Sequence, residues 1–188
     1  MKYMGQDKLE NKLKQEHIKH KIGLLGGTFD PPHKGHVKIS LEAKRRYKLN
    51  YIIWSITKKN PFKNKSLYSL KKRIELAKKN NKKNSFIKVK YLEDKVGSNK
   101  TFDLLSYLKS KNKNMDIYFI MGADNLIKLH KWYKWQQILK EFKILVFDRN
   151  KYKSKSLKSV AYKKFRKKGL DYINFKKINI SSSQLRKI

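Results

Sequence analysis

The chain has 188 residues, of which 39% are apolar, and it carries a formal net charge of +35. This length suits one domain with a core large enough to be stable without metals or disulfides. The absence of cysteine excludes disulfides, thiolate metal sites and cysteine nucleophiles. The sequence holds neither an apolar run of about 18 residues nor a signal-peptide segment, so we expect a cytoplasmic protein that does not enter a membrane.

The positive charge is spread along the whole chain and comes mostly from lysine. Of the 49 basic residues, 43 are lysine and 6 are arginine, and they stand beside 14 asparagines and 17 isoleucines. Selection for phosphate or base recognition tends to use the bidentate fork of arginine. We therefore interpret the charge as a compositional bias over a solvated surface, with only non-specific binding of nucleic acid. A functional polycation is the alternative.

Residues 1–20 are polar and carry apolar points at Leu9, Leu13 and Ile18. This spacing permits either one amphipathic helix or a mobile tail. We interpret the segment as a peripheral N-terminal extension of the domain that follows it.

From residue 21 onward, short apolar runs alternate with longer helical patterns. The alternation predicts successive βαβ units around a mainly parallel sheet, and the near-continuous apolar runs indicate strands covered on both faces. Strands are predicted at 21–25, 51–56, 86–91, 115–121 and 143–147, with a weaker pattern at 172–175. Helices are predicted at 35–49, 68–80, 101–111, 123–139 and 154–167, with a short one starting near Ser182. Residues 21–188 are thus expected to form one Rossmann-like, doubly wound α/β domain.

The loop after the first predicted strand carries most of the functional signal. Residues 26–36 read GGTFDPPHKGH. Ligands of open α/β sheets bind outside the carboxyl ends of strands, and Gly26 and Gly27 let the backbone approach a ligand closely. The helix that follows offers unpaired N–H groups and the positive end of its dipole to an anion. His33 and His36, three residues apart at this helix start, can face one ligand together; capping or core packing is the alternative for either histidine alone.

This loop resembles the signature of the bacterial nicotinate-nucleotide adenylyltransferases, within the H-x-G-H nucleotidyltransferase superfamily. Residues 180–186, ISSSQLR, are similar to the phosphate-binding segment I-S-S-T-x-I-R of that family, with Ser183 for Thr and Leu185 for Ile. Residues 60–63 (NPFK), 100–103 (KTFD), 119–124 (FIMGAD) and 131–133 (KWY) match family segments as well, so the resemblance spans roughly 20–188. Many relatives continue beyond the point where this chain ends, which leaves a short form and a truncated chain as alternatives.

The resemblance implies transfer of the adenylyl group of ATP to nicotinate mononucleotide, giving deamido-NAD and pyrophosphate in NAD biosynthesis. A phosphate oxygen of the mononucleotide attacks the α-phosphorus in line, so catalysis rests on positioning and electrostatic stabilisation. The implied partners are ATP and a pyridine mononucleotide. Mg²⁺ is expected to arrive with the ATP phosphates, which removes the need for a metal site built from protein side chains.

The resemblance also implies a role for individual residues. His33, His36 and Arg186 would be catalytic. The ATP-binding residues would be Gly26, Thr28, Phe29, His33, His36, Ser181, Ser182 and Arg186. The residues that bind the nicotinate nucleotide would be Gly27, Thr101, Asp124, Trp132 and Tyr133.

Structural alternatives exist for several of these residues. Arg186 could be a plain surface arginine, and Thr101 could be a helix N-cap. Trp132 lies three residues before Trp135, so both could be core residues. The histidines interpreted as non-catalytic are His17, His20 and His130.

Three other functions stay open. Two are adenylyl transfer to nicotinamide mononucleotide or to phosphopantetheine; the latter enzyme typically has threonine where His33 stands. The third, from a different class, is a basic nucleic-acid-binding protein without enzymatic activity. That interpretation explains neither the two histidines nor the C-terminal serine–arginine segment. The sequence does not indicate an oligomeric state.

Overall fold

The computed structural model describes residues 20–59, 66–112, 114–149, 151–166 and 168–174. Its strands are β1 (His20–Gly27), β2 (Tyr51–Ile56), β3 (Ile87–Lys90), β4 (Met115–Gly122), β5 (Lys143–Phe147) and β6 (Leu170–Ile173). Its helices are α2 (Lys34–Tyr47), α3 (Leu70–Asn80), α4 (Glu93–Val96), α5 (Thr101–Lys111), α6 (Ala123–Lys128), α7 (Trp135–Glu141), α8 (Lys153–Leu157) and α9 (Val160–Phe165), with a 3₁₀ helix η1 (Leu129–Lys131).

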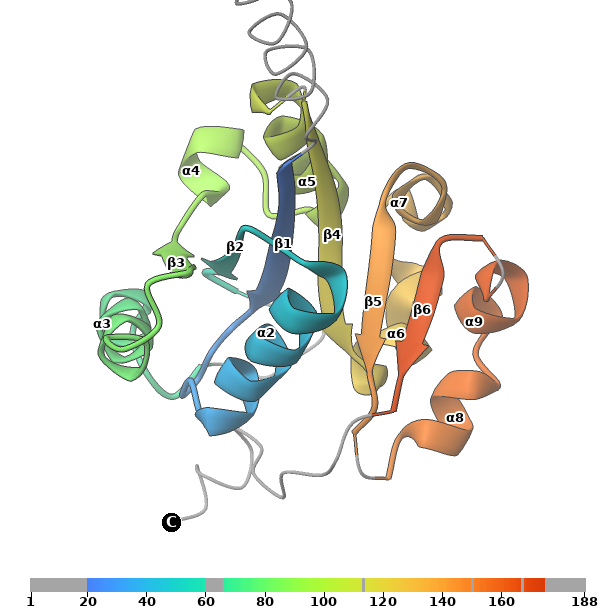
Figure 1. Ribbon diagram of the computed structural model, residues 1–188, viewed down its shortest axis with the longest axis horizontal. Coiled ribbons are helices and arrows are strands. Elements are labelled where there is room, and N and C mark those ends of the chain that lie inside the picture. Colours follow the sequence, from blue (N-terminus) through green and yellow to red (C-terminus); the bar gives the residue numbers. More distant parts are fainter. Residues whose placement is uncertain (1–19, 60–65, 113, 150, 167, 175–188) are drawn as a thin grey trace, which may run out of the picture.

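The six strands form one sheet in the order β3-β2-β1-β4-β5-β6, and every neighbouring pair is parallel. The chain builds the sheet outward from β1 through β2 to β3, returns to the other side of β1 with β4, and continues to β6 (Figure 1). The strand order reverses between β1 and β4, and ligands of such folds bind in the crevice at the carboxyl edge of the sheet at this point. This arrangement confirms the predicted doubly wound, Rossmann-like fold.

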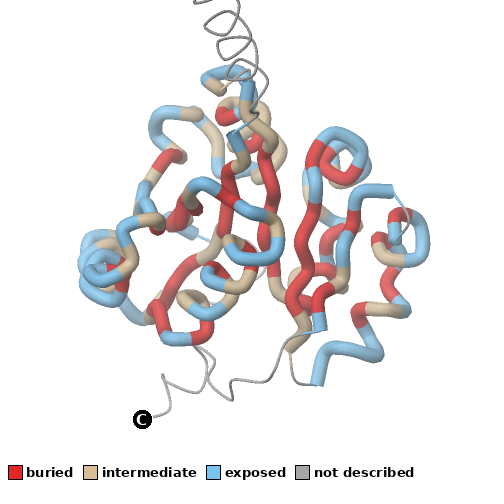
Figure 2. Tube along the Cα trace, viewed as in Figure 1, coloured by how far each residue is buried: buried red, intermediate tan, exposed pale blue. Residues whose placement is uncertain are grey.

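Helices cover both faces of the sheet and bury two separate apolar cores. In β4, Ile117, Phe119 and Met121 point into one core, whereas Tyr118 and Ile120 point into the other. The first core is closed by α5, α6, α7 and α9, and the second by α2 and α3. Figure 2 shows that the buried residues run along the strands and the inner sides of these helices. Burial on both faces explains why the strands read as continuous apolar runs.

Two predicted helices are divided in the structure. The helix predicted at 123–139 consists of α6, η1 and α7, because Trp132 is extended and Lys134 adopts a left-handed φ of 50°. The helix predicted at 154–167 consists of α8 and α9, because the side chain of Ser159 caps α9 by accepting from the N–H of Tyr162 at 3.3 Å. Those two predictions were wrong about continuity.

Smaller differences concern short elements. The short helix α4 has no counterpart among the predicted elements, and the last strand begins at Leu170, two residues before the predicted pattern. The helix predicted near Ser182 lies outside the described residues, as does the extension up to residue 19. No helix in the described part of the chain is long and apolar enough to cross a membrane.

Two tyrosines tie the last strand to the rest of the domain. The hydroxyl of Tyr47, at the end of α2, donates to the carboxylate of Asp171 at 3.0 Å, and that of Tyr172 donates to Asp148 at 2.9 Å. Burial, and the carboxylate beside each phenol, raise the pKa of Tyr47 and of Tyr172 to about 12. Loss of either proton would place two negative charges in contact.

The free energy of unfolding is therefore expected to fall between pH 10 and pH 12. Because the pKa of an unfolded tyrosine is about 10, the stabilisation is complete below that pH and is lost as the pH rises through the folded value. Tyr47→Phe and Tyr172→Phe should each reduce this pH dependence, measured by urea denaturation at several pH values. Tyr152→Phe, which changes an exposed tyrosine, is the control. If the free energy of unfolding falls equally steeply with pH in the wild type and in all three variants, the raised pKa values of Tyr47 and Tyr172 would be contradicted.

Candidate active site

The predicted glycine–histidine loop leaves the carboxyl end of β1 and turns directly into α2. Thr28, Asp30 and His33 are buried in it, with exposed fractions of 8%, 2% and 6%. Phe29 has a left-handed φ of 48°, which bulky side chains rarely adopt, and its ring is only 2% exposed. The ring is held by stacking on Trp54 of β2, with centroids 4.8 Å apart. The loop is thus a packed element with a fixed backbone.

His33 and His36 are the N-cap and the third residue of α2. Nδ1 of His33 accepts from the N–H of Gly35 at 3.1 Å, and Nδ1 of His36 accepts from the N–H of His33 at 3.2 Å. The two rings lie 3.9 Å apart between centroids. Because each Nδ1 is an acceptor, the neutral imidazoles carry their proton on Nε2. The structure therefore shows the capping alternative for both histidines, since each Nδ1 accepts from a backbone N–H at the start of α2.

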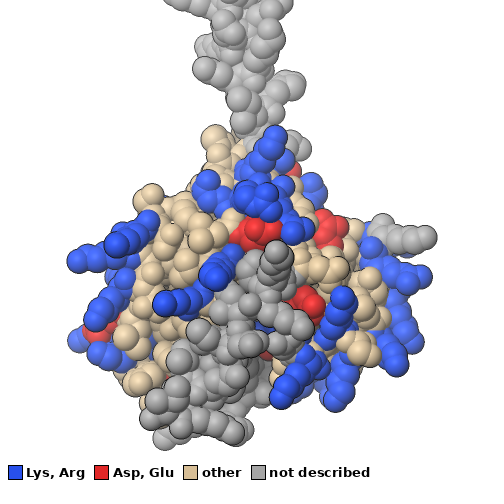
Figure 3. Space-filling view, turned by 60° about the horizontal axis from the view of Figure 1, so that its bottom comes forward, with Lys and Arg blue, Asp and Glu red and all other residues tan. Residues whose placement is uncertain are grey.

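The first turn of α2 contains no acidic side chain, so its positive end keeps its attraction for anions. In a view turned toward the carboxyl edge of the sheet, Lys and Arg side chains lie along the left and right margins of the face that is seen (Figure 3). Such surroundings favour the approach of phosphates.

A buried arginine joins this loop to the loop after β2. Arg73 of α3 is 2% exposed and donates to the carbonyl oxygens of Thr28 at 2.6 Å, Thr57 at 2.8 Å and Lys58 at 3.0 Å, while its Nε donates to Tyr68 at 3.1 Å. Burial lowers the pKa of Arg73, and nearby carboxylates act in the opposite direction. Sequence reasoning missed Arg73, although an arginine stands out in a chain whose basic residues are nearly all lysine.

The carboxylates that face Arg73 belong to Asp30 and Glu93. Asp30 accepts from the N–H groups of Leu67 at 2.7 Å and Tyr68 at 3.0 Å. Glu93 accepts from the hydroxyl of Thr57 and from the N–H of Lys58. Asp30 thus holds the backbone just before α3, and Glu93 holds the loop after β2. Together with Arg73, these bonds join the two loops into one hydrogen-bonded unit.

The segment FIMGAD ends β4 beside the crevice. Asp124 pairs with Arg149 at 3.1 Å through Oδ2, and its buried Oδ1 has no hydrogen-bond partner among the described residues. A Cβ at position 122 would lie 2.5 Å from that Oδ1 and 2.8 Å from Cδ of Arg149, so a larger residue there would displace the side chains of this ion pair. Sequence analysis found Gly122 and Asp124 by resemblance but missed Arg149.

The predicted nicotinate-binding side chains lie on the face of the first core. Trp132 is partly buried and packs against Phe119, with ring centroids 6.2 Å apart. A Cβ on Gly26 would lie 3.7 Å from the same phenylalanine, whereas one on Gly27 would lie 3.4 Å from the ring of Phe29. The two glycines therefore face opposite sides of the sheet.

Trp132 and Trp135 both contact the core, as the structural alternative predicted, and the indole Nε1 of Trp132 is buried without a partner among the described residues. Tyr133 is 49% exposed and meets Phe102 edge-on. Thr101 is the first residue of α5, and the N-cap is Lys100, so the N-cap alternative for Thr101 was wrong.

Several predicted residues cannot be placed. Ser181, Ser182 and Arg186 lie outside the described residues, as does the segment 60–63. The described residues contain no group of three or more His, Cys, Asp or Glu side chains that could hold a metal. The roles of all predicted residues toward a substrate stay predictions.

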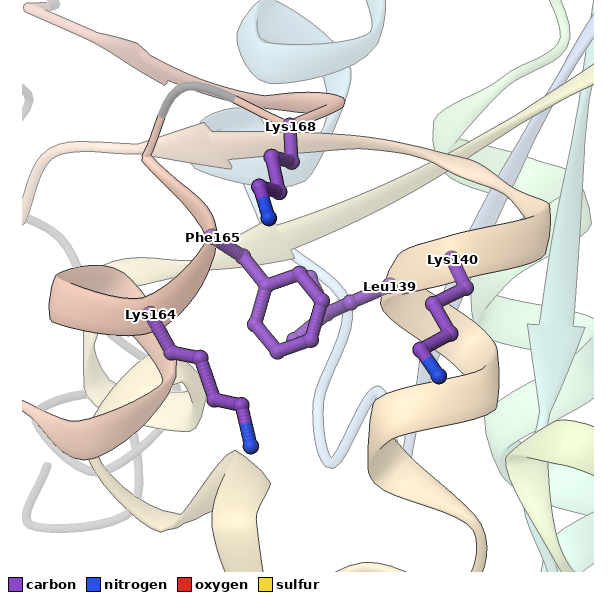
Figure 4. A pocket seen from close by; sticks show the side chains of 5 residues that line it. All are labelled: Leu139, Lys140, Lys164, Phe165 and Lys168. Carbon is purple, nitrogen blue, oxygen red and sulfur yellow. The ribbon is translucent and has the colours of Figure 1, made fainter.

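A cavity of about 350 Å³ lies between α7 and α9, away from the loop described above (Figure 4). The buried side chains of Leu139 and Phe165 form its floor, and three exposed lysines surround it. None of the predicted site residues lines it.

Residues 24–188 match the model of the cytidylyltransferase-like family. Over 181 residues the chain is 63% identical to a probable nicotinate-nucleotide adenylyltransferase of Pelagibacter ubique (strain HTCC1062), and the alignment covers 96% of this chain and 99% of that relative. Over 130 residues it is 41% identical to a probable nicotinate-nucleotide adenylyltransferase of Bradyrhizobium sp. (strain ORS 278), covering 69% and 67%. A solved structure, Plasmodium falciparum nicotinic acid mononucleotide adenylyltransferase complexed with NaAD, is similar in fold, with a TM-score of 0.72, 23% identity and coverage of 89% and 83%.

The parallel sheet and the histidine loop at its switch point are those of a nucleotidyltransferase. The similarity to the Pelagibacter ubique relative extends over 96% of the chain. The chain belongs to the nicotinate-nucleotide adenylyltransferases, within the cytidylyltransferase-like family.

Replacement of Arg73 should destabilise the protein far more than replacement of a surface arginine. Arg73→Met leaves four backbone carbonyl oxygens without their donor and removes the positive charge beside Asp30 and Glu93, so we expect a loss of about 3 kcal/mol in the free energy of unfolding. Arg73→Lys should lose part of this, because one ammonium group cannot reach all four carbonyls. Urea denaturation measures both.

Arg45→Met is the matched control, since it removes an arginine whose ion pair with Glu42 lies at the surface, and it should change stability little. An Arg73→Met variant as stable as Arg45→Met would show that the carbonyl contacts contribute nothing.

Proposed function

We propose that this protein transfers the adenylyl group of ATP to nicotinate mononucleotide and releases pyrophosphate. The observation that carries the proposal is the pair of imidazoles at the start of α2, both with Nδ1 as acceptor, in a chain that belongs to this family. A phosphate oxygen of the mononucleotide attacks the α-phosphorus, the bond to the β-phosphate oxygen breaks, and its electron pair leaves with pyrophosphate. The attacking phosphate is already an anion at neutral pH, so no general base is required.

The protein's task in this reaction is to bring two anions together and to stabilise the charge that develops. Nε2–H of His33 and Nε2–H of His36 donate to the ATP phosphates, with His36 nearest the α-phosphate. The N-terminal end of α2 adds its dipole to the same position. Mg²⁺ bound to the ATP phosphates would reduce their charge, and its ligands there would be phosphate and water oxygens.

Other groups complete the ATP site. The backbone at Gly26, Thr28 and Phe29 lines the nucleotide, as the buried loop allows. Ser181, Ser182 and Arg186 supply hydroxyl, N–H and guanidinium donors to the β- and γ-phosphates. Arginine suits this position because its fork can engage two phosphate oxygens at once.

The mononucleotide lies beside ATP, on the face of the sheet that carries the first core. Trp132, which already rests on Phe119, stacks on the pyridine ring, and the exposed Tyr133 encloses it. The backbone of Gly27 and the first turn of α5 at Thr101 meet the nicotinate group. Asp124 accepts from a ribose hydroxyl through the carboxylate oxygen that Arg149 leaves unbound.

The remaining assignments follow from this function. Residues 21–188 form the catalytic domain and residues 1–20 an extension of it. The reaction takes place in the cytoplasm. Binding to nucleic acid is non-specific and arises from the lysine-rich surface.

The choice of acceptor is tested by turnover. We expect release of pyrophosphate from ATP and Mg²⁺ with nicotinate mononucleotide, and a much lower kcat/KM with nicotinamide mononucleotide or phosphopantetheine. Chelation of Mg²⁺ should abolish the reaction, because the phosphates then keep their full charge. A higher kcat/KM with either of the other acceptors, or no turnover with any, would overturn the proposal.

The role of His36 is tested by truncation. His36→Ala should lower kcat by about 10²–10³-fold, the usual effect of removing one donor to a developing charge. Circular dichroism should show that the variant is folded. The control is His20→Ala, which changes an exposed histidine at the opposite end of β1 and should leave kcat unchanged. Full activity in a folded His36→Ala variant would remove the residue from the mechanism.

A further inference from the structure

Three aromatic rings from three elements meet at the first turn of α2. The ring of Phe29 lies 4.8 Å from that of Trp54 at an interplanar angle of 23°, and 4.7 Å from the imidazole of His36. Trp54 also meets His36 edge-on at 5.8 Å. Trp54 is completely buried on β2, so it can affect a substrate only through the residues that it contacts.

A hydrogen-bonded path links the same two residues. The indole N–H of Trp54 donates to Oγ of Ser40 at 2.9 Å, and the hydroxyl of Ser40 donates to the carbonyl oxygen of His36 at 2.9 Å. Ser40 is fully buried as well. Trp54 therefore reaches both the ring and the backbone of His36.

We propose that Trp54 is a positioning residue that holds the imidazole of His36 in the orientation in which Nε2–H meets the transferring phosphate. The terminal torsion of a histidine side chain has a broad energy profile, so the surrounding contacts decide where the ring points. In this site the rings of Phe29 and Trp54 both contact the imidazole, and the N–H of His33 donates to its Nδ1. The proposal rests on the adenylyl transfer proposed above.

Removal of the indole should lower the turnover number and leave substrate binding nearly unchanged. We expect Trp54→Leu to reduce kcat by about 10–100-fold, the range for a small displacement of a catalytic group. The KM values for ATP and nicotinate mononucleotide should stay within about twofold. Trp54→Phe keeps a ring beside Phe29 but loses the donor to Ser40, and it should fall between the wild type and Trp54→Leu.

Trp135→Leu is the matched control. It removes another packed indole, which contacts Phe165 on the opposite face of the sheet. It should destabilise the protein and keep the wild-type kcat at a temperature at which all variants are folded.

A double-mutant cycle separates positioning from general stability. If Trp54 acts through His36, Trp54→Leu should have no further effect on kcat in a His36→Ala background. An equal fold-decrease in both backgrounds would overturn the proposal.

The ring orientation can also be measured without turnover. The ¹⁵N spectrum of the His36 imidazole, identified by its loss in His36→Ala, should show the Nε2–H tautomer in the wild type and a mixture of tautomers in Trp54→Leu. An unchanged tautomer would overturn the positioning role. Absence of adenylylated product in the wild type would reject the proposed function, and the imidazole spectra would still decide the role of Trp54.

Discussion

The guanidinium of Arg73 fixes the relative positions of the loops that follow β1 and β2. Backbone carbonyls at the ends of parallel strands lose their sheet partners as the chain diverges, and buried carbonyls need donors. Arg73 provides several donors in one rigid plane, and the charges of Asp30 and Glu93 offset the cost of burying it. Catalysis by positioning needs a loop backbone that does not move, so the function of the histidine loop depends on this buried group.

Histidine at an N-cap explains how the loop can be both stable and reactive. Serine, aspartate or asparagine could also cap the start of α2, but their short side chains keep every polar atom close to the capped N–H group. An imidazole has two nitrogens on opposite sides of its ring. His33 and His36 use Nδ1 for the backbone, and this fixes the proton on Nε2, where it can serve as a donor. In the proposed reaction, the capping interactions would therefore orient the two donors as well as start the helix.

The spacing of apolar residues was enough to predict helices and strands whose pattern is continuous along the chain. The helix α5 has the predicted bounds, because its apolar spacing is uninterrupted between a loop and an asparagine. The predicted helix over 123–139 was wrong because its interruption depends on a lysine, Lys134, with a left-handed φ, for which sequence gives no signal. The helix α4 is too short for periodicity to reveal.

The same distinction applies to the candidate site. The histidine loop and the FIMGAD segment are continuous motifs, so resemblance could find them. Arg73 and Trp54 are isolated letters whose partners lie far away in sequence: Arg73 reaches Thr28 across 45 positions, and Trp54 reaches Ser40 across 14. Their importance arises from tertiary contacts that no local pattern contains.

The large positive charge can explain the attraction of anionic substrates but not the choice among them. Its field speeds the encounter with two anionic nucleotides, but at physiological salt it is screened beyond about 8 Å and does not distinguish one phosphate from another. Discrimination needs donors at fixed positions, and in the proposed reaction these would be Nε2–H of His33 and of His36 and the guanidinium of Arg186. The surface lysines can therefore concentrate both substrates, whereas the choice between a nicotinate and a nicotinamide group would need fixed polar contacts to that group.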